Sequence, residues 1–324
     1  MQDTIPVLIT GMGGALGISF LKALRMSSFP CQVFGTDVEP LAVGLHMCDA
    51  AYILPDSRTE PDTYLAKLVE LCRAQKIRIL FAGSEVEMRL LARHKKRLEK
   101  ESGAVMLVNG AQVTETACDK WKTAQFLQKK GLPVPDSVLP ERQQDLARLI
   151  ERHGYPLIVK PRSSYGSQGL YLVPGERELN AALVLVKKAI VQEYLTPDDQ
   201  EYTVGVFMDQ KSRPLGSIIF RRWLGGGLTH RAIVVKNPVI EHTARQAAAA
   251  FKAVGPINVQ LRLTARGPVI FEVNPRMSSS TVMRAYFGFN EPELAIRQFV
   301  LGEQITPPRV KEGIAMRYWE ELYI

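Results

Sequence analysis

The first 110 residues alternate between short apolar runs and segments whose apolar residues recur every three or four positions. The apolar runs, each closed by a polar residue or a glycine, are PVLIT (6–10), QVFGTD (32–37), RILFAG (78–83) and AVMLVN (104–109). The segments with helical spacing are ISFLKALRMS (18–27), DTYLAKLVELCRAQ (62–75) and EVEMRLLARHKKRLEKES (85–102). Strands that alternate with helices pair in parallel through right-handed crossovers. The pattern therefore predicts an α/β, Rossmann-like N-terminal domain.

The pattern changes after residue 112, where strands follow one another as hairpins with helices between groups of them. The predicted helices are DKWKTAQFLQKKG (119–131), QDLARLIERHG (144–154) and TARQAAAAFKAVG (243–255). The predicted strands are YPLIVKP (155–161), AIVQEYL (189–195), EYTVGVFMD (201–209), PLGSIIFRRW (214–223), AIVVK (232–236), INVQLRLT (257–264) and PVIFEVN (268–274). Antiparallel strands with helices on one side are typical of an α+β architecture.

Composition narrows the class of protein. The chain is 46% hydrophobic and 23% charged, as globular proteins are, and no apolar run approaches the roughly 18 residues of a membrane span. The start lacks a basic leader, and the four cysteines form no CxxC pair, so we expect a reduced, cytoplasmic protein. The net charge of +8 includes a cluster at residues 89–100 that we interpret as a solvated helix face. We expect neither nucleic acid nor membrane as a partner.

The strongest chemical signal is the predicted hairpin over residues 257–274. Side chains alternate along a strand, so Gln260 shares one face with its polar neighbours. If the turn centres near Arg266, Gln260 lies opposite Glu272, and Ile270, Glu272 and Asn274 share a face. Oxygen atoms of Gln260, Glu272 and Asn274 would then converge, and Mg²⁺ prefers such ligands. The alternative is the polar outer face of an amphipathic hairpin.

Three further motifs suit phosphate and nucleotide binding. Arg276 follows the hairpin directly, and its planar fork suits a phosphate or carboxylate, with Ser278–Ser280 offering hydroxyls beside it. Lys160 ends an apolar strand before the flexible loop 163–169, which could close over phosphates, or could be a plain surface hairpin. The strand end QEYL (192–195) reads as a hinge, and Glu201 on the next strand offers an acceptor for ribose hydroxyls.

In their order along the chain these motifs resemble the ATP-grasp superfamily. The order is DK (119–120), VKP with its Gly/Ser loop, QEYL, EYTV, NVQ (258–260) and FEVNPR (271–276). NVQ together with EVNPRMSSST most resembles one synthetase unit of the carbamoyl phosphate synthetase large chain. The resemblance implies a Rossmann-like domain (1–112), then a two-subdomain ATP-grasp fold with a small lid subdomain (113–191) and a large subdomain carrying the metal site (192–324).

The resemblance also implies a role for each motif. It assigns ATP phosphates to Lys120 and Lys160, and phosphoryl transfer to Lys160 and Arg276. It assigns the lid to Ser163, Ser164, Gly166, Ser167 and Gly169. It assigns adenine and ribose to Gln192, Glu193, Tyr194, Leu195 and Glu201. It assigns Mg²⁺, which Mn²⁺ could replace, to Gln260, Glu272 and Asn274.

The implied reaction is ATP-dependent ligation of a small-molecule carboxylate to an amine or ammonia through an acyl phosphate, by a protein that could be a homodimer. Carbamoyl phosphate synthesis itself needs two phosphorylations in a duplicated chain and an amidotransferase, and this sequence holds one unit and no amidotransferase segment. The sequence therefore favours a stand-alone carboxylate–amine ligase. Neither substrate is identified by it.

Two other classes stay open. The turn GMGGALG (11–17), with Asp37 ending the next strand, nearly spells a dinucleotide fingerprint, so an NAD(P)-binding oxidoreductase is the rival. The same turn could be a structural junction or part of an acceptor-substrate site. A nucleotide-binding module without turnover is the third class. His230 and Arg317 are minor candidates, and His46, His94, His153 and His242 lie apart without metal-ligand spacing.

Overall fold

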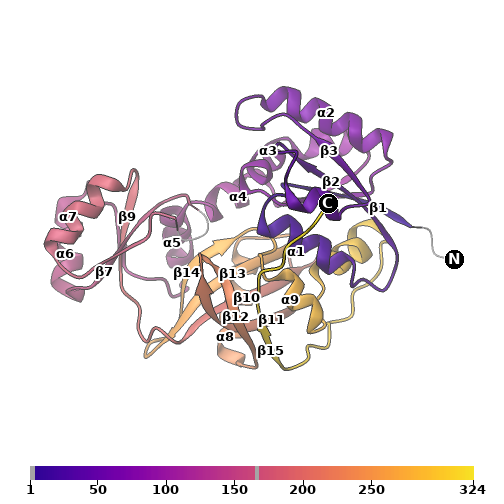
Figure 1. Cartoon of the computed structure of the whole chain (residues 1–324). Helices are drawn as coiled ribbons and strands as arrows, with labels where there is room; N and C mark the ends of the chain where they lie inside the picture. The colour runs from indigo at the N-terminus through magenta and orange to yellow at the C-terminus, as the bar shows by residue number, and fades with distance from the viewer. Residues whose placement is uncertain (1–3, 165–167) are drawn as a thin grey trace.

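The structure, a computed structural model, describes residues 4–164 and 168–324. The N-terminal part is a five-stranded parallel sheet in the order β3-β2-β1-β4-β5, as the alternating pattern predicts (Figure 1). Its strands are β1 (Ile5–Thr10), β2 (Cys31–Asp37), β3 (Ala50–Ile53), β4 (Ile79–Ala82) and β5 (Val105–Leu107). Its helices are α1 (Ala15–Leu24), η1 (Val43–Met47), α2 (Pro61–Ala74) and α3 (Glu85–Ser102).

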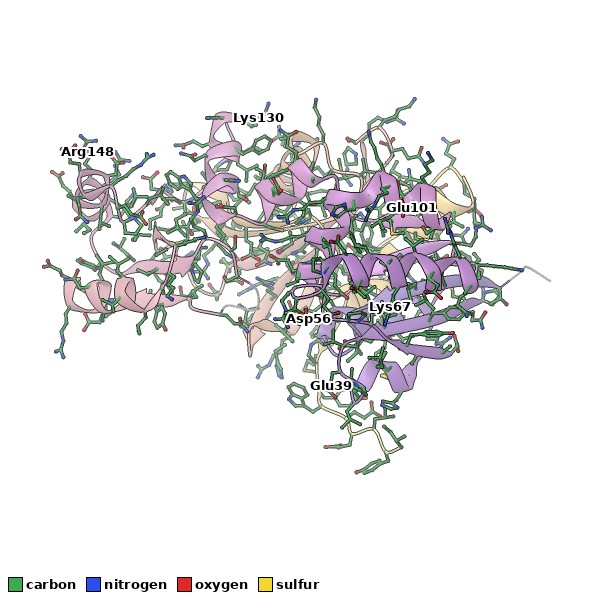
Figure 2. The ribbon with its side chains drawn as sticks, turned by 90° about the horizontal axis from the view of Figure 1, so that it is seen from above. Glu39, Asp56, Lys67, Glu101, Lys130 and Arg148 are labelled. Carbon is green, nitrogen blue, oxygen red and sulfur yellow. The ribbon has the colours of Figure 1, made fainter. Side chains whose placement is uncertain are left out.

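Helix α3 shows how the basic surface arises. Leu91 and Leu98 are buried and pack against the sheet, whereas Arg93, Lys96 and Arg97 on the opposite face are exposed. Gly103, at φ 75°, ends the helix in a left-handed conformation that glycine adopts without strain. Charged side chains on other parts of the chain are exposed as well, among them Lys67, Lys130 and Arg148, which Figure 2 labels. The solvated helix face predicted for residues 89–100 is confirmed.

The middle of the chain forms a small antiparallel sheet in the order β6-β9-β7-β8, at one end of the molecule (Figure 1). Its strands are β6 (Ser137–Val138), β7 (Leu157–Pro161), β8 (Tyr171–Val173) and β9 (Ala189–Glu193). Helices α6 (Gln143–His153) and α7 (Glu176–Leu185) pack against it. The connecting helices are α4 (Ala111–Ala117) and α5 (Lys120–Lys129).

The C-terminal part is a six-stranded antiparallel sheet in the order β14-β13-β10-β11-β12-β15. Its strands are β10 (Glu201–Met208), β11 (Pro214–Gly225), β12 (Leu228–Val235), β13 (Gly255–Thr264), β14 (Gly267–Asn274) and β15 (Ile314–Met316). Helix α8 (Pro238–Ala250) begins with Asn237, whose side chain accepts from the N–H groups of Val239 and Ile240. Its alanine-rich face covers the sheet.

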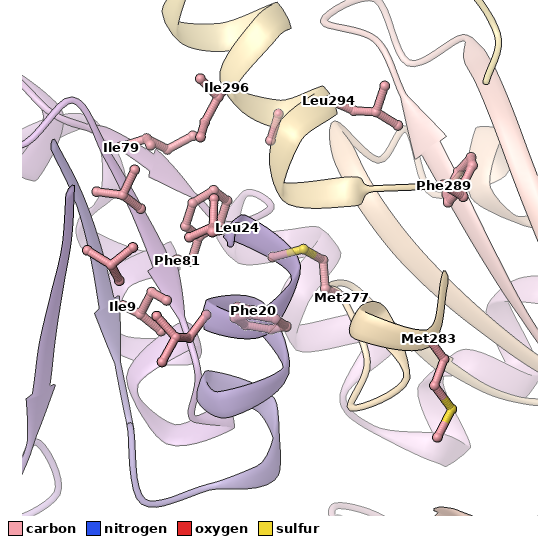
Figure 3. Packing of buried hydrophobic residues seen from close by; sticks show 14 of the residues in the cluster. Ile9, Phe20, Leu24, Ile79, Phe81, Met277, Met283, Phe289, Leu294 and Ile296 are labelled. Carbon is pink, nitrogen blue, oxygen red and sulfur yellow. The ribbon is translucent and has the colours of Figure 1, made fainter. Parts of the chain in front are cut away.

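A shared hydrophobic core joins the N-terminal sheet to the C-terminal elements α9 (Thr281–Tyr286), α10 (Glu291–Ala295) and η2 (Ile296–Val300). Figure 3 shows Phe20 and Phe81 facing Met277 and Ile296 across this contact. Ser19 Oγ also accepts from the N–H of Val282 at 2.9 Å. The N-terminal sheet is therefore anchored on the large sheet, and both can contribute walls to one site.

None of the helices within the described ranges combines the length and apolar character that crossing a bilayer needs. Strand β9 runs to Glu193, two residues past the expected boundary at 191. The division into residues 1–112, 113–191 and 192–324 stays a prediction.

Candidate active site

A cavity of about 590 Å³ lies between the carboxyl ends of the N-terminal parallel strands and the large antiparallel sheet. One wall holds the glycine turn after β1 and the loop after β4. The other wall holds side chains of β10, β11, β13 and β14, and Lys120 and Lys160 reach it from α5 and β7. Open α/β sheets bind ligands at the carboxyl ends of their strands, where neighbouring loops diverge. The cavity occupies that position, between β1 and β4.

The β13–β14 hairpin delivers the polar residues that the sequence singled out. Gln260 pairs directly with Glu272, as predicted, and Asn274 pairs with Asn258. The same-face prediction for Ile270 is wrong, because the register shifts between Gln260 and Leu261. This β-bulge sends Ile270 into the core and leaves Phe271 and Glu272 both lining the cavity.

Glu272 is the centre of a polar cluster. Its Oε1 accepts from Gln260 Nε2 at 3.2 Å and from Asn274 Nδ2 at 2.9 Å, and its Oε2 lies 3.9 Å from Lys120 Nζ. Burial alone would raise the pKa of the Glu272 carboxyl. The adjacent Lys120, the Asn274 hydrogen bond and Lys160 instead hold that pKa below its usual value. The carboxylate is therefore ionised at neutral pH.

The donor set fits a hard divalent cation in part. Glu272 supplies a charged oxygen, and among the described residues Asn274 Oδ1 is contacted only by Arg276 Nη2, at 3.4 Å. Gln260 Oε1 accepts from Arg222 Nη2 at 2.6 Å, so its oxygen is free for a metal only if that hydrogen bond is exchanged. Glu272 and Asn274 are suitable Mg²⁺ ligands in their present positions. Gln260 becomes one when its oxygen is released from Arg222.

Two lysines reach the cavity from the small-sheet side. Lys120 follows Asp119, whose side chain caps α5, and its Nζ donates to Ser164 O at 3.1 Å and Ser164 Oγ at 3.3 Å. Lys160 is 5% exposed, and its Nζ lies 5.8 Å from the centre of the Phe271 ring. Burial lowers the pKa of Lys160 to about 8, helped by the charge of Lys120 and partly offset by Glu272. Together they form a concentrated positive site.

The predicted lid residues are described only in part. Ser163 Oγ donates to Cys118 O at 3.0 Å, which ties the start of the loop to α4. Gly169, at φ 70°, packs so closely that a β-carbon would lie 2.9 Å from Pro161 Cγ. Gly166 and Ser167 lie outside the described residues. The role of the loop as a lid stays a prediction.

The hinge residues begin at the end of β9 in the small sheet and continue into the segment that leads to β10, and as far as the chain is described they do not line the cavity. Gln192 Nε2 donates to Ser137 Oγ at 2.7 Å. Glu193 accepts from Arg266 Nη2 at 2.7 and 2.8 Å. Tyr194 donates to Asp198, and Leu195 O accepts from Arg262. Their adenine-binding role stays a prediction.

The same junction holds a carboxylate–histidine cluster that the sequence did not reveal. His153 Nε2 lies 2.8 Å from Asp136 Oδ2, and His153 Nδ1 lies 3.5 Å from Glu193 Oε2. The sequence assigned no partner to His153, because only the fold of α6 brings it back to β9. Arg152 and Arg266 already pair with the two carboxylates, so the cluster is neutralised by cations of the chain.

Glu201 lines the cavity with both oxygens engaged. Its Oε1 accepts from Arg222 Nη2 at 2.9 Å, and its Oε2 accepts from Arg262 Nη2 at 2.9 Å. Arg222, whose side chain is 9% exposed, also bonds Gln260 and was missed from the sequence. The run IIFRRW contained the signal, since strand alternation places only one of its two arginines on the cavity face.

Arg276 lies where the large sheet meets the N-terminal domain. Its Nη1 donates to Met277 O at 3.0 Å, and its Nη2 lies 3.8 Å from Glu85 Oε2. In the next loop, Ser278 Oγ and Ser280 Oγ are 2.7 Å apart, and Ser278 and Ser279 line the cavity. The guanidinium is therefore held at the cavity edge beside Asn274.

The glycine turn forms the opposite wall. Asp37 Oδ2 accepts from the N–H of Gly13 at 2.7 Å, and Oδ1 accepts from the N–H groups of Val38 and Glu39. Gly17 is structural, because a β-carbon there would lie 2.8 Å from Gly11 O. Deeper in the wall, burial raises the pKa of the Glu87 carboxyl to about 7, although Thr10 and Tyr64 donate to it. Glu87 was also missed.

The minor candidates lie at the rim. His230 does not line the cavity within the described ranges, but its neighbour Thr229 does. Arg317 donates to Thr229 O at 3.2 Å and to Ser279 O at 2.7 Å. The tail therefore reaches the rim of the cavity through this arginine.

Comparison with known proteins gives three family matches in succession. Residues 7–107 match "PylC-like, N-terminal domain", residues 117–211 match "RimK-like ATP-grasp domain", and residues 186–322 match "ATP-grasp in the biosynthetic pathway with Ter operon". The carbamoyl phosphate synthase large chains of Pyrococcus furiosus and Hyperthermus butylicus are 23% and 24% identical over 82% of this chain. The chain spans 26% of the length of each.

Solved structures share the whole architecture at low identity. N5-carboxyaminoimidazole synthetase from Staphylococcus aureus, complexed with ADP, superposes with a TM-score of 0.76 at 17% identity, over 98% of this chain and 83% of that one. The biotin carboxylase domain of Hydrogenobacter thermophilus 2-oxoglutarate carboxylase, with MgADP and bicarbonate, gives 0.70 at 16% identity, over 97% and 74%. L-amino acid ligase from Bacillus licheniformis gives 0.69 at 18% identity, over 92% and 75%.

Proposed function

Because this chain is an ATP-grasp protein, we propose that it is an ATP- and Mg²⁺-dependent ligase that joins a carboxylate to an amine or ammonia. The observation that carries the proposal is the cavity in which Lys120 and Lys160 lie beside Glu272, Asn274 and Arg276. The lysines supply positive charge for phosphates, and the hairpin residues supply oxygen ligands for a metal. Both groups face one space that is large enough for a nucleotide and a second substrate. The ADP, MgADP and bicarbonate bound by two structural neighbours support this interpretation.

The residues divide the work of phosphoryl transfer. Lys120 and Lys160 would hold ATP phosphates, and Glu272 with Asn274 would hold Mg²⁺, which supplies further neutralisation of phosphate charge when bound. An oxygen of the substrate carboxylate attacks the γ-phosphorus, the bond to the β,γ-bridging oxygen breaks, and ADP leaves. Arg276 would stabilise the charge on the transferring group. The amine nitrogen then attacks the acyl carbon, the bond to the phosphate oxygen breaks, and phosphate and a proton are released.

The glycine turn faces the same cavity, which supports a role as the wall for the second substrate. An NAD(P) oxidoreductase is not favoured, because the cavity that the glycine turn lines also holds Lys120, Glu272 and Asn274, which suit phosphates and a metal ion. Intact Glu272 and Arg276 argue against a module without turnover. We keep the predicted domain boundaries, the small-molecule partners and a homodimer as parts of this proposal.

The experiment that tests the function is a screen for ADP and phosphate release. We expect release that requires ATP, Mg²⁺, one carboxylate and one amine together, in a panel of amino acids, simple amines, ammonia and bicarbonate. Calorimetric titration should show binding of Mg-ATP and none of NAD or NADP. Tight NAD binding without ATP binding would refute the ligase assignment.

Nucleotide affinity should depend on pH through Lys160. The pKa of this lysine is lowered to about 8, so its ammonium is present below that pH and is lost as the pH rises through it. A phosphate chain binds the charged form, and we expect the dissociation constant of Mg-ATP to increase by several-fold between about pH 7 and 9. Lys160→Arg, which stays charged, should remove this dependence. An unchanged profile in the arginine variant would assign the titration to another group.

A further inference from the structure

A buried ion pair lies beneath the floor of the cavity. Arg284 on α9 and Glu291 on α10 are both 0% exposed, and Arg284 Nη1 lies 3.1 Å from Glu291 Oε1. Thr281 Oγ1 donates to the second carboxylate oxygen at 3.0 Å. Buried ion pairs cost desolvation and are weak evidence for stability, so the remaining contacts of this pair are informative.

The other terminal nitrogen of Arg284 points into the large sheet. Its Nη2 donates to Asn258 Oδ1 on β13 and to Thr203 Oγ1 on β10, the latter at 3.2 Å. Thr203 Oγ1 in turn donates to Asn258 Oδ1 at 2.7 Å. The approach requires Gly205, because a β-carbon there would lie 2.5 Å from Arg284 Nη1. The sheet is therefore built around this guanidinium.

The contact settles which way the Asn258 amide points. A guanidinium only donates, so the amide atom facing Arg284 is the oxygen, and Nδ2 is directed away from it. Asn258 is 0% exposed and lines the cavity. Its Nδ2 has no hydrogen-bond partner among the residues that the structure describes. A buried donor left without a partner is costly, so this one is suited to a ligand in the cavity.

The position of Asn258 along β13 indicates which ligand atom it meets. Arg262 pairs with Glu201 at one end of the strand, and Gln260 pairs with Glu272 in the middle. Asn258 pairs with Asn274 at the other end, towards Arg276 and the serine loop. The resemblance to ATP-grasp proteins assigns the ribose to the Glu201 end, and in the proposed function the phosphates lie beside Lys120, near Glu272. The group that accepts the γ-phosphate then lies at the Asn258 end.

We propose that Asn258 binds the ionised carboxylate of the donor substrate through Nδ2, and that Arg284 is a positioning residue that holds the amide in this orientation. The inference rests on the proposed function and adds a second contact for the carboxylate beside Arg276. Thr203 and Glu291 complete the support, since each bonds Arg284.

The test uses the carboxylate and amine found in the release screen. Asn258→Asp keeps the oxygen that faces Arg284 and Thr203 but removes the donor. We expect the KM for the carboxylate to rise by about 10- to 100-fold, the usual effect of losing a hydrogen bond to a charged group, with the KM for ATP changed less than about twofold. Asn180→Asp, at an exposed position on α7, is the matched control and should change neither.

The positioning role is tested by removing the ion pair as a unit. Arg284→Met with Glu291→Leu leaves no unpaired buried charge, and we expect it to raise the carboxylate KM several-fold without affecting the ATP KM. Adding Asn258→Asp should then raise that KM no further than Asn258→Asp alone, because both changes act through one hydrogen bond. If the pair variant does not fold, Arg284→Lys replaces it in the same comparison.

Each outcome has one meaning. An unchanged carboxylate KM in Asn258→Asp overturns the contact, and additive effects of the two changes overturn the positioning role. A wild-type protein that releases no ADP with any carboxylate overturns the proposed function instead.

Discussion

Glu272→Ala is expected to lower ADP release by about 10³-fold, the upper end of what one charge-stabilising group contributes. Glu272 is the acidic member of the hairpin cluster, and its carboxylate is kept ionised by Lys120 and Lys160. Removing it would take away the charged oxygen proposed to hold Mg²⁺ and would leave Lys120 without its neighbouring carboxylate. Turnover should be measured with the substrates from the screen at saturating Mg-ATP.

The fold should survive this change, because Glu272 lies at the cavity wall and its side chain is 25% exposed. We expect a thermal midpoint within a few degrees of wild type. Glu272→Gln, of nearly the same shape, should be almost as inactive, since it lacks the charge. Glu151→Ala, at an exposed position on α6, is the control for a lost carboxylate. Near-normal turnover in Glu272→Gln would mean that Glu272 does not hold the metal.

The spacing of apolar residues predicted the strands and helices well, because each element must bury one face of its own sequence. The strand–helix alternation over residues 6–109 yielded the parallel sheet, and the hairpin signal paired Gln260 with Glu272. The turn pairs Thr264 with Gly267, so without the bulge Gln260 would lie opposite Phe271. A bulge inserts one residue into a strand without a reliable signal in the sequence. The side of the sheet on which Ile270 lies was therefore predicted wrongly.

The missed residues share another cause. Arg222, Asn258 and Arg284 acquire their roles from contacts between segments far apart in the chain, such as α9 and β13. A sequence pattern reports which face a residue takes within its own strand or helix, whereas these contacts depend on how separate elements dock. His153 and Glu193 meet for the same reason, since α6 folds back on β9. The resemblance to ATP-grasp proteins identified the residues of the motifs, but not the residues that hold them in place.

Arg276→Ala is expected to slow ADP release by about 10²–10³-fold while Mg-ATP binds almost normally. The guanidinium lies beside Asn274, held by Met277 O and near Glu85, at the end of the cavity where the carboxylate would meet the γ-phosphate. A contact that strengthens as charge moves in the transition state affects turnover more than ground-state affinity. Single-turnover ADP formation and calorimetric ATP binding, measured on the same preparation, separate the two.

Arg276→Lys distinguishes a planar fork from a simple positive charge. A lysine ammonium is a point charge that cannot donate two parallel hydrogen bonds, so we expect it to recover only part of the lost rate. The exposed Arg177→Ala on α7 is the control for general loss of positive charge and should turn over normally. If Arg276→Ala instead weakened ATP binding and, at saturating nucleotide, released ADP at the wild-type rate, Arg276 would belong to the nucleotide site and not to the reacting centre.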